Sequence, residues 1–138
     1  MRQVNLLIAI FLWGIVPGVA QTSLPPNVPL KIRLEFRIKR EELNELRTTL
    51  AQFAQNEQLT VNDIGAQMPP RQGRPLFHLE LDRQDRSVRI TVTNIRAEDR
   101  MFVWFYEYRA GSTLAEMDTK LEQVLREKWP TLAPYEGS

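Results

Sequence analysis

The amino-acid sequence predicts an α+β domain, a two-layer sandwich with two helices on one face of a four-stranded, mostly antiparallel sheet. Two segments repeat apolar residues at steps of three and four, which is the spacing of an amphipathic helix. Four other segments show the alternation, or the short apolar run, of a β-strand. The elements follow in the order β-α-β-β-β-α, and residues 31–130 form a single domain.

The domain begins with its most regular strand, residues 31–39, in which apolar and charged side chains alternate without interruption. The apolar face of this strand consists of Ile32, Leu34, Phe36 and Ile38. Residues 40–59 then follow helical spacing, with a stripe formed by Leu43, Leu46, Leu50 and Phe53. Both patterns predict an apolar surface that faces a shared core.

A long loop is expected over residues 60–75, because three prolines and two glycines interrupt any regular spacing there. Alternation returns in residues 76–82 and again in residues 88–93, with a polar turn at residues 83–86 between them. Two alternating runs joined by a short polar turn predict a β-hairpin.

The fourth strand, residues 101–109, is apolar on both faces over its first six positions, as in a central strand. One face carries the aromatic residues Phe102, Trp104, Tyr106 and Tyr108. The other face ends in Glu107 and Arg109, which favours an outward position for that face and places the aromatic residues under the helices. In the reverse register the four aromatic residues line the open face, where they would anchor a protein or glycan partner.

A second helix, from about residue 113 to Trp129, completes the domain. Thr113 and Glu116 have the spacing of a capping box. Pro130 ends the helix, because its ring cannot continue one. The tail, residues 131–138, is expected to be loose.

Residues 1–20 have the features of a secretory signal peptide, with a basic start, an apolar stretch and a small-x-small site before the cut. The predicted cleavage lies between Ala20 and Gln21. The alternative is a permanent membrane anchor, but the apolar stretch is shorter than the roughly 20 residues that a spanning helix needs. We therefore expect an exported protein, periplasmic in a bacterium or otherwise secreted, without stable membrane insertion after cleavage. The proline-rich lead-in, residues 21–30, is expected to be flexible.

The charge balance and the residue types exclude several classes of function. Cleavage removes Arg2 alone among the charged residues, which leaves equal numbers of basic and acidic side chains and argues against a nucleic-acid partner. The chain has no cysteine and one histidine, so neither disulfides nor a metal or other cofactor is expected. No Gly-rich phosphate loop and no nucleophilic serine motif occurs in the sequence, and we expect no catalytic residues.

The expected recognition surface combines the open face of the sheet with the proline-rich loop. On the sheet its candidate residues are Arg33, Glu35, Arg37, His78, Glu80, Arg89, Val103 and Phe105. In the loop they are Met68, Pro69, Pro70 and Arg71. The charged set has a simpler interpretation, namely cross-strand pairs that keep an open sheet soluble.

These observations predict a non-enzymatic binding module that recognises a protein partner, in the manner of an inhibitor or immunity protein. One alternative is a structural or accessory subunit of a cell-envelope assembly, and a homodimer is also left open. A second alternative is a small hydrolase that uses Glu35, Glu80 or Asp82 as acid and base.

Overall fold

The computed structural model of the chain describes residues 30–70 and 75–136. The predicted signal peptide with its cleavage site, the lead-in up to residue 29, the loop residue Arg71 and the last two residues lie outside this description. Within it, no helix is long and apolar enough to cross a membrane.

The described chain contains six strands, two α-helices and two short 3₁₀ turns. In order they are β1 (Leu30–Arg37), η1 (Arg40–Glu42), α2 (Leu43–Glu57), β2 (Leu59–Asp63), η2 (Gly65–Gln67), β3 (His78–Arg83), β4 (Val88–Thr93), β5 (Arg100–Glu107), α3 (Leu114–Lys128) and β6 (Ala133–Pro134).

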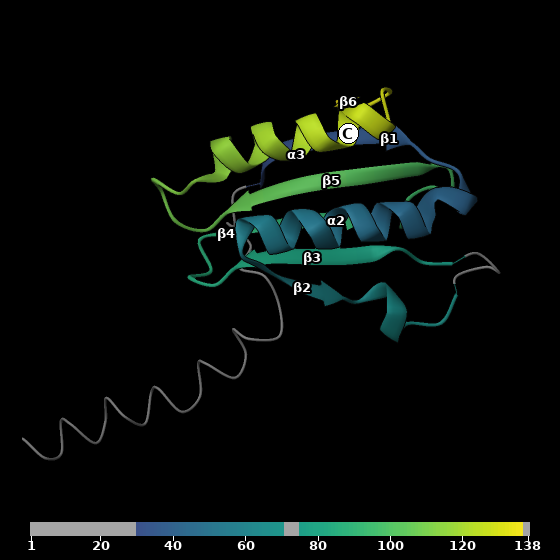
Figure 1. Ribbon diagram of the computed structural model, residues 1–138, viewed down its shortest axis with the longest axis horizontal. Helices are drawn as coiled ribbons and strands as arrows, with labels where there is room; N and C mark the ends of the chain where they lie inside the picture. The colour runs from purple at the N-terminus through teal and green to yellow at the C-terminus, as the bar shows by residue number, and fades with distance from the viewer. Residues whose placement is uncertain (1–29, 71–74, 137–138) are drawn as a thin grey trace, which may run out of the picture.

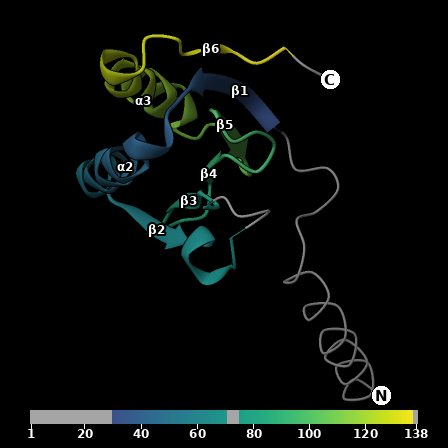
Figure 2. The same ribbon diagram turned by 90° about the vertical axis from the view of Figure 1, so that its right-hand side faces the viewer.

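The strands form one sheet in the order β2-β3-β4-β5-β1-β6, and every neighbouring pair is antiparallel. The two α-helices run along the sheet, and both lie on the same side of it (Figures 1 and 2). The α+β class, the two helices and the antiparallel sheet are thus confirmed. The predicted number of four strands is wrong, because β2 and β6 extend the sheet at its two edges.

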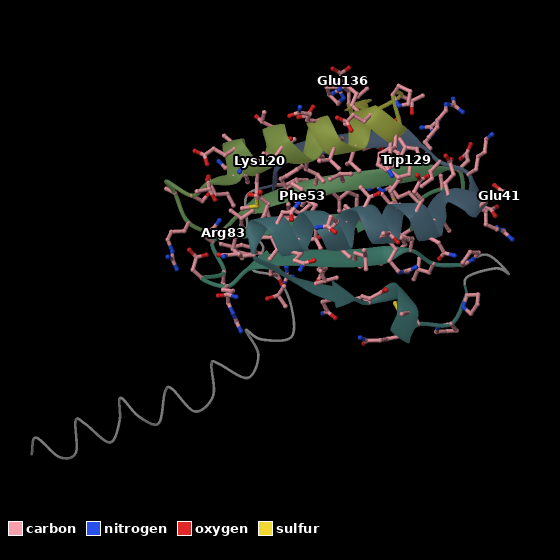
Figure 3. All side chains as sticks on the ribbon, in the orientation of Figure 1. Glu41, Phe53, Arg83, Lys120, Trp129 and Glu136 are labelled. Atoms are coloured by element: carbon pink, nitrogen blue, oxygen red, sulfur yellow. The ribbon has the colours of Figure 1, made fainter. Side chains whose placement is uncertain are left out.

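The hydrophobic core lies between the helices and the covered face of the sheet. The predicted helix stripes enter it, and Phe53 of α2 and Trp129 at the end of α3 lie in this layer (Figure 3). Trp129 packs against Phe36 of β1, with ring centroids 5.4 Å apart. Strands β1, β3 and β4 place their predicted apolar faces in the core, including Leu34, Leu79, Leu81, Ile90 and Val92.

The predicted orientation of β5 is wrong. Met101, Val103 and Phe105 are fully buried beneath the helices, and Phe102, Trp104 and Tyr106 point to the open face instead. Glu107 seemed to mark an outward face, but it ends the strand, where its carboxylate accepts a hydrogen bond from Ser112 Oγ at 2.5 Å. Val103 and Phe105 therefore cannot contact a partner while the domain is folded.

Strand β2 begins at Leu59, the last residue of the predicted helical segment, and continues into the segment that was predicted to be a long loop. Helix α2 ends at Gln58, which adopts a left-handed conformation (φ 58°) and donates its backbone N–H to Ala54 and Gln55. Glycine usually occupies this position, so the sequence carries no signal for the turn. The chain then runs back along β3, with Leu59 paired with Arg83.

The tail after Pro130, predicted to be loose, is fixed along β1 as far as it is described. Leu132 is only 3% exposed, so it anchors the segment in the core. Tyr135 donates its backbone N–H to Arg33 O at 2.9 Å, and Thr131 Oγ1 accepts from Arg37 N at 2.9 Å. Figure 2 shows this segment beside β1 at the edge of the sheet.

An acidic pair on α3 makes the stability of the fold depend on pH. Burial raises the pKa of the Asp118 carboxyl to about 7, and the neighbouring carboxyl of Glu122, which is also paired with Arg126, adds to this effect. Because the folded chain holds this proton more tightly than the unfolded chain, stability should fall as the pH rises from about 4 to about 7.

We therefore expect Asp118→Asn to be more stable than the parent at pH 8, by about 1 kcal/mol after allowance for solvent screening. The difference should shrink toward pH 4, where both side chains are neutral. Urea denaturation across this pH range measures the effect. Asp99→Asn, at a side chain that is 70% exposed, is the matched control and should show no such trend. Equal stability of Asp118→Asn and the parent at both ends of the range would contradict the expectation.

Candidate functional site

The face of the sheet opposite the helices carries side chains from alternate positions of all the long strands. One row across it runs from Arg33 of β1 through Trp104 and Thr91 to Glu80 of β3. The next row runs from Glu35 through Phe102 and Thr93 to His78. This open face divides into a charge-paired half over β3 and β4 and an aromatic half over β5, β1 and β6.

In the charge-paired half, three of the predicted site residues are brought together. Arg89 donates two hydrogen bonds to Asp82, at 2.7 and 3.2 Å, and lies 3.5 Å from Glu80. His78 lies 3.8 Å from Glu80 and contacts Thr93 Oγ1 at 3.0 Å. The hydrogen bond to Asp82 raises the pKa of the Arg89 guanidinium. These groups satisfy one another, as cross-strand charge pairing requires.

The aromatic half contains a hollow of about 230 Å³, which we call the aromatic hollow. Its lining consists of Leu30, Arg33, Arg96, Trp104, Tyr106 and Tyr135. Strands β1 and β5 supply its floor, the segment after β6 supplies Tyr135, and the loop between β4 and β5 supplies Arg96.

A set of hydrogen bonds and ring contacts holds the hollow in shape. The ring of Tyr135 meets Phe102 edge-on, with centroids 5.2 Å apart. The guanidinium carbon of Arg96 lies 5.8 Å from the ring of Trp104 and 5.9 Å from that of Tyr135, and Arg96 also donates to Tyr135 Oη at 3.0 Å. Cation–π attraction and this hydrogen bond therefore fix the guanidinium at the wall of the hollow.

The lining of the hollow is rich in hydrogen-bond donors and contains no carboxylate. Among the described residues, Arg33 and Arg96 have no carboxylate within 4.0 Å, whereas Arg89 has two. The buried indole Nε1 of Trp104 donates to no acceptor among the residues that the structure describes. Desolvation raises the pKa of the Tyr106 phenol, so its hydroxyl remains a neutral donor at physiological pH.

The other predicted site residues are dispersed. Glu35 pairs with Arg100 at 3.6 Å, and Arg37 lies 4.0 Å from Asp99. The loop residues Met68, Pro69 and Pro70 are exposed and follow η2 at the β2 end of the sheet, away from the hollow. The structure therefore does not join the proline-rich loop and the aromatic half of the face into one surface.

Of the residues that line the hollow, Arg33 was among the predicted site residues, whereas Leu30, Arg96 and Tyr135 were not predicted. Trp104 and Tyr106 carried a signal, because the reverse register of β5 places aromatic residues on the open face. Arg96 lies in a polar turn and Tyr135 in a segment without regular spacing. Their proximity results from contacts between distant parts of the chain, which no local pattern reports.

The three carboxylates considered for a hydrolase do not converge. Glu35 lies on β1 and Glu80 on β3, with β5 and β4 between them. Three strand spacings separate them by about 14 Å. Glu80 and Asp82 are close on the same strand, but both engage Arg89. No group of three or more metal-ligating side chains is arranged to hold an ion in residues 30–70 or 75–136.

A scan against protein-family models, a search of curated proteins and a search of solved structures each find no match to this chain.

Proposed function

We propose that this chain is an exported, non-enzymatic binding module that recognises a protein partner through the open face of its sheet, as an inhibitor or immunity protein would. The observation that carries the proposal is the aromatic hollow. Trp, Tyr and Arg are the residues that most often dominate the energy of protein–protein interfaces, and here they line one concavity.

The chemistry of the hollow favours binding over catalysis. Its polar groups are guanidinium, indole and phenol donors, and no carboxylate or imidazole lines it to act as a base near neutral pH. On the other half of the face, the carboxylates of Glu80 and Asp82 are both engaged by the guanidinium of Arg89. A rigid floor of paired strands and an Arg96 side chain already fixed in place reduce the entropy lost on binding.

The rival function, a subunit fixed permanently in an envelope assembly, requires a large contiguous apolar surface. The large apolar side chains exposed in the described part of the chain are scattered instead: Leu30 lies on β1, Val61 on β2, Met68 after η2 and Tyr108 after β5. This distribution favours a module that is monomeric alone and binds a separate partner.

Site-specific photocrosslinking in the cells that carry the protein tests the proposal. A benzoylphenylalanine at position 106 places the crosslinker in the aromatic hollow, while the same group at Gln123, exposed on α3, is the matched control on the helix layer. We expect one defined protein to crosslink from position 106 and not from position 123.

The captured protein should form a one-to-one complex with the purified mature chain, which should be monomeric alone in size-exclusion chromatography. Trp104→Ala should weaken the complex at least tenfold, because truncation of an interface tryptophan removes a central anchor. The proposal would be contradicted if position 106 gave no crosslink or if both positions crosslinked equally. It would also be contradicted if the free chain were an obligate oligomer.

A further inference from the structure

We infer that the aromatic hollow receives an acidic side chain of the protein partner, held by Arg33 and Arg96, with an adjacent apolar residue packed on Trp104 and Tyr106. This inference rests on the proposed function and specifies the chemistry of the partner.

Charge is distributed unevenly over the open face. Arg37, Arg89 and Arg100 each have a carboxylate within 4.0 Å. Arg33 and Arg96 line the same hollow, and the described residues supply neither of them with such a partner. The two guanidinium groups beside one cavity repel each other, and a bound anion adds two attractions that offset this repulsion.

The donors of the hollow are already oriented in the free protein. Arg96 is already held by Tyr135 Oη and by two aromatic rings. Its planar fork matches a carboxylate, and less conformational freedom remains to be lost on binding. The unpartnered Nε1 of Trp104 adds a donor, and a buried donor without an acceptor is unfavourable until one is supplied.

The size and lining of the hollow suit a side chain rather than a whole small molecule. Its volume of about 230 Å³ is below the 300–1,000 Å³ typical of sites that enclose a whole small molecule, so it suits a side chain presented by a larger partner. Its remaining walls are Leu30 and the aromatic rings, which provide an apolar surface for the residue beside the carboxylate. An acidic side chain flanked by an apolar one would meet both the guanidinium donors and the apolar walls of the hollow.

Three short peptides test the inference against the folded, isotope-labelled mature chain by NMR. They are acetyl-Leu-Glu-Leu-amide, its neutral analogue acetyl-Leu-Gln-Leu-amide, and acetyl-Leu-Gly-Leu with a free C-terminal carboxylate. The indole N–H signal of Trp104 reports on the hollow, and that of Trp129, buried in the core, is an internal reference. We expect the Glu peptide to shift the Trp104 signal and to bind about tenfold more tightly than the Gln peptide.

Arg33→Gln and Arg96→Gln should each weaken binding of the Glu peptide about tenfold. Arg37→Gln, on the same face but 69% exposed and outside the hollow, should leave it unchanged. The inference would be overturned if the Gln peptide bound as tightly as the Glu peptide or if the Glu peptide did not bind. It would also be overturned if the Trp104 signal did not move. If the peptide with the free C-terminal carboxylate binds more tightly than the Glu peptide, the ligand is a chain terminus and not an acidic side chain, and the inference is wrong.

The photocrosslinking experiment separates this failure from failure of the proposed function. Suppose that a partner is captured from position 106 and that the double variant Arg33→Glu, Arg96→Glu binds it with unchanged affinity. The proposed binding function is then retained, and the inferred acidic side chain is wrong. If no partner is captured from that position, the proposed function itself fails.

Discussion

Replacing Phe105 with alanine should lower the free energy of unfolding by about 3–5 kcal/mol. Phe105 is fully buried at the centre of the sheet, on a strand that pairs with β4 on one side and β1 on the other. Removal of its ring leaves a cavity beneath both helices that the surrounding core cannot fill completely. Urea denaturation of the mature chain, followed by circular dichroism, measures the change.

Tyr106→Ala is the matched control, since the neighbouring side chain points to the open face. We expect it to cost about 1 kcal/mol, as a half-buried residue outside the core should. If Phe105→Ala does not fold, Phe105→Leu keeps the comparison measurable, with an expected cost of about 1–1.5 kcal/mol. A larger cost for Tyr106→Ala than for the substitution at Phe105 would mean that the two faces of β5 are assigned the wrong way round.

Gly65→Ala should destabilise the fold by about 2–3 kcal/mol, through overpacking rather than through a cavity. A Cβ at this position would lie 2.5 Å from Leu76 O and 2.8 Å from His78 N. Both atoms belong to the backbone, so relief requires η2 to move away from the start of β3. The free energy of unfolding should fall, and amide hydrogen exchange should show weaker protection along the β2–β3 ladder.

Gly111→Ala separates this steric effect from backbone strain. Its added Cβ meets nothing within 4 Å, but the residue has a φ of 79°, which a residue with a side chain rarely adopts. We expect a cost of about 1 kcal/mol from this strain alone. Stability of the Gly65 variant within about 0.5 kcal/mol of the parent would contradict the packing of η2 against β3.

The sequence predicted an element well where one of its faces is clearly charged. Strand β1 alternates apolar and charged residues, so both its position and its orientation follow from the pattern. Strand β5 is apolar on both faces, so the sequence pattern does not indicate which face is buried. That choice is made by packing against the helices. Glu107 gave the wrong phase, because it lies at the end of the strand, where Ser112 compensates its charge.

The two edge strands were missed because long-range contacts rather than local propensity define them. Strand β2 depends on the left-handed turn at Gln58. Because this position is not a glycine, the sequence did not indicate that the helix ends there. Strand β6 has only two residues and depends on the buried Leu132 and on hydrogen bonds to β1. The same contacts bring Tyr135 to the aromatic hollow, so the site could not be predicted without the tail.

The position of β1 between β5 and β6 also constrains the order in which the domain can fold. As the chain is made from its N-terminus, β1 emerges long before either of its neighbours. Until then its charged face, with Arg33, Glu35 and Arg37, helps to keep the unpaired strand from associating with other chains. Tyr135, which closes the hollow, comes after every other described element. A nascent chain therefore cannot complete the aromatic hollow until Tyr135 has been added and has docked beside β1.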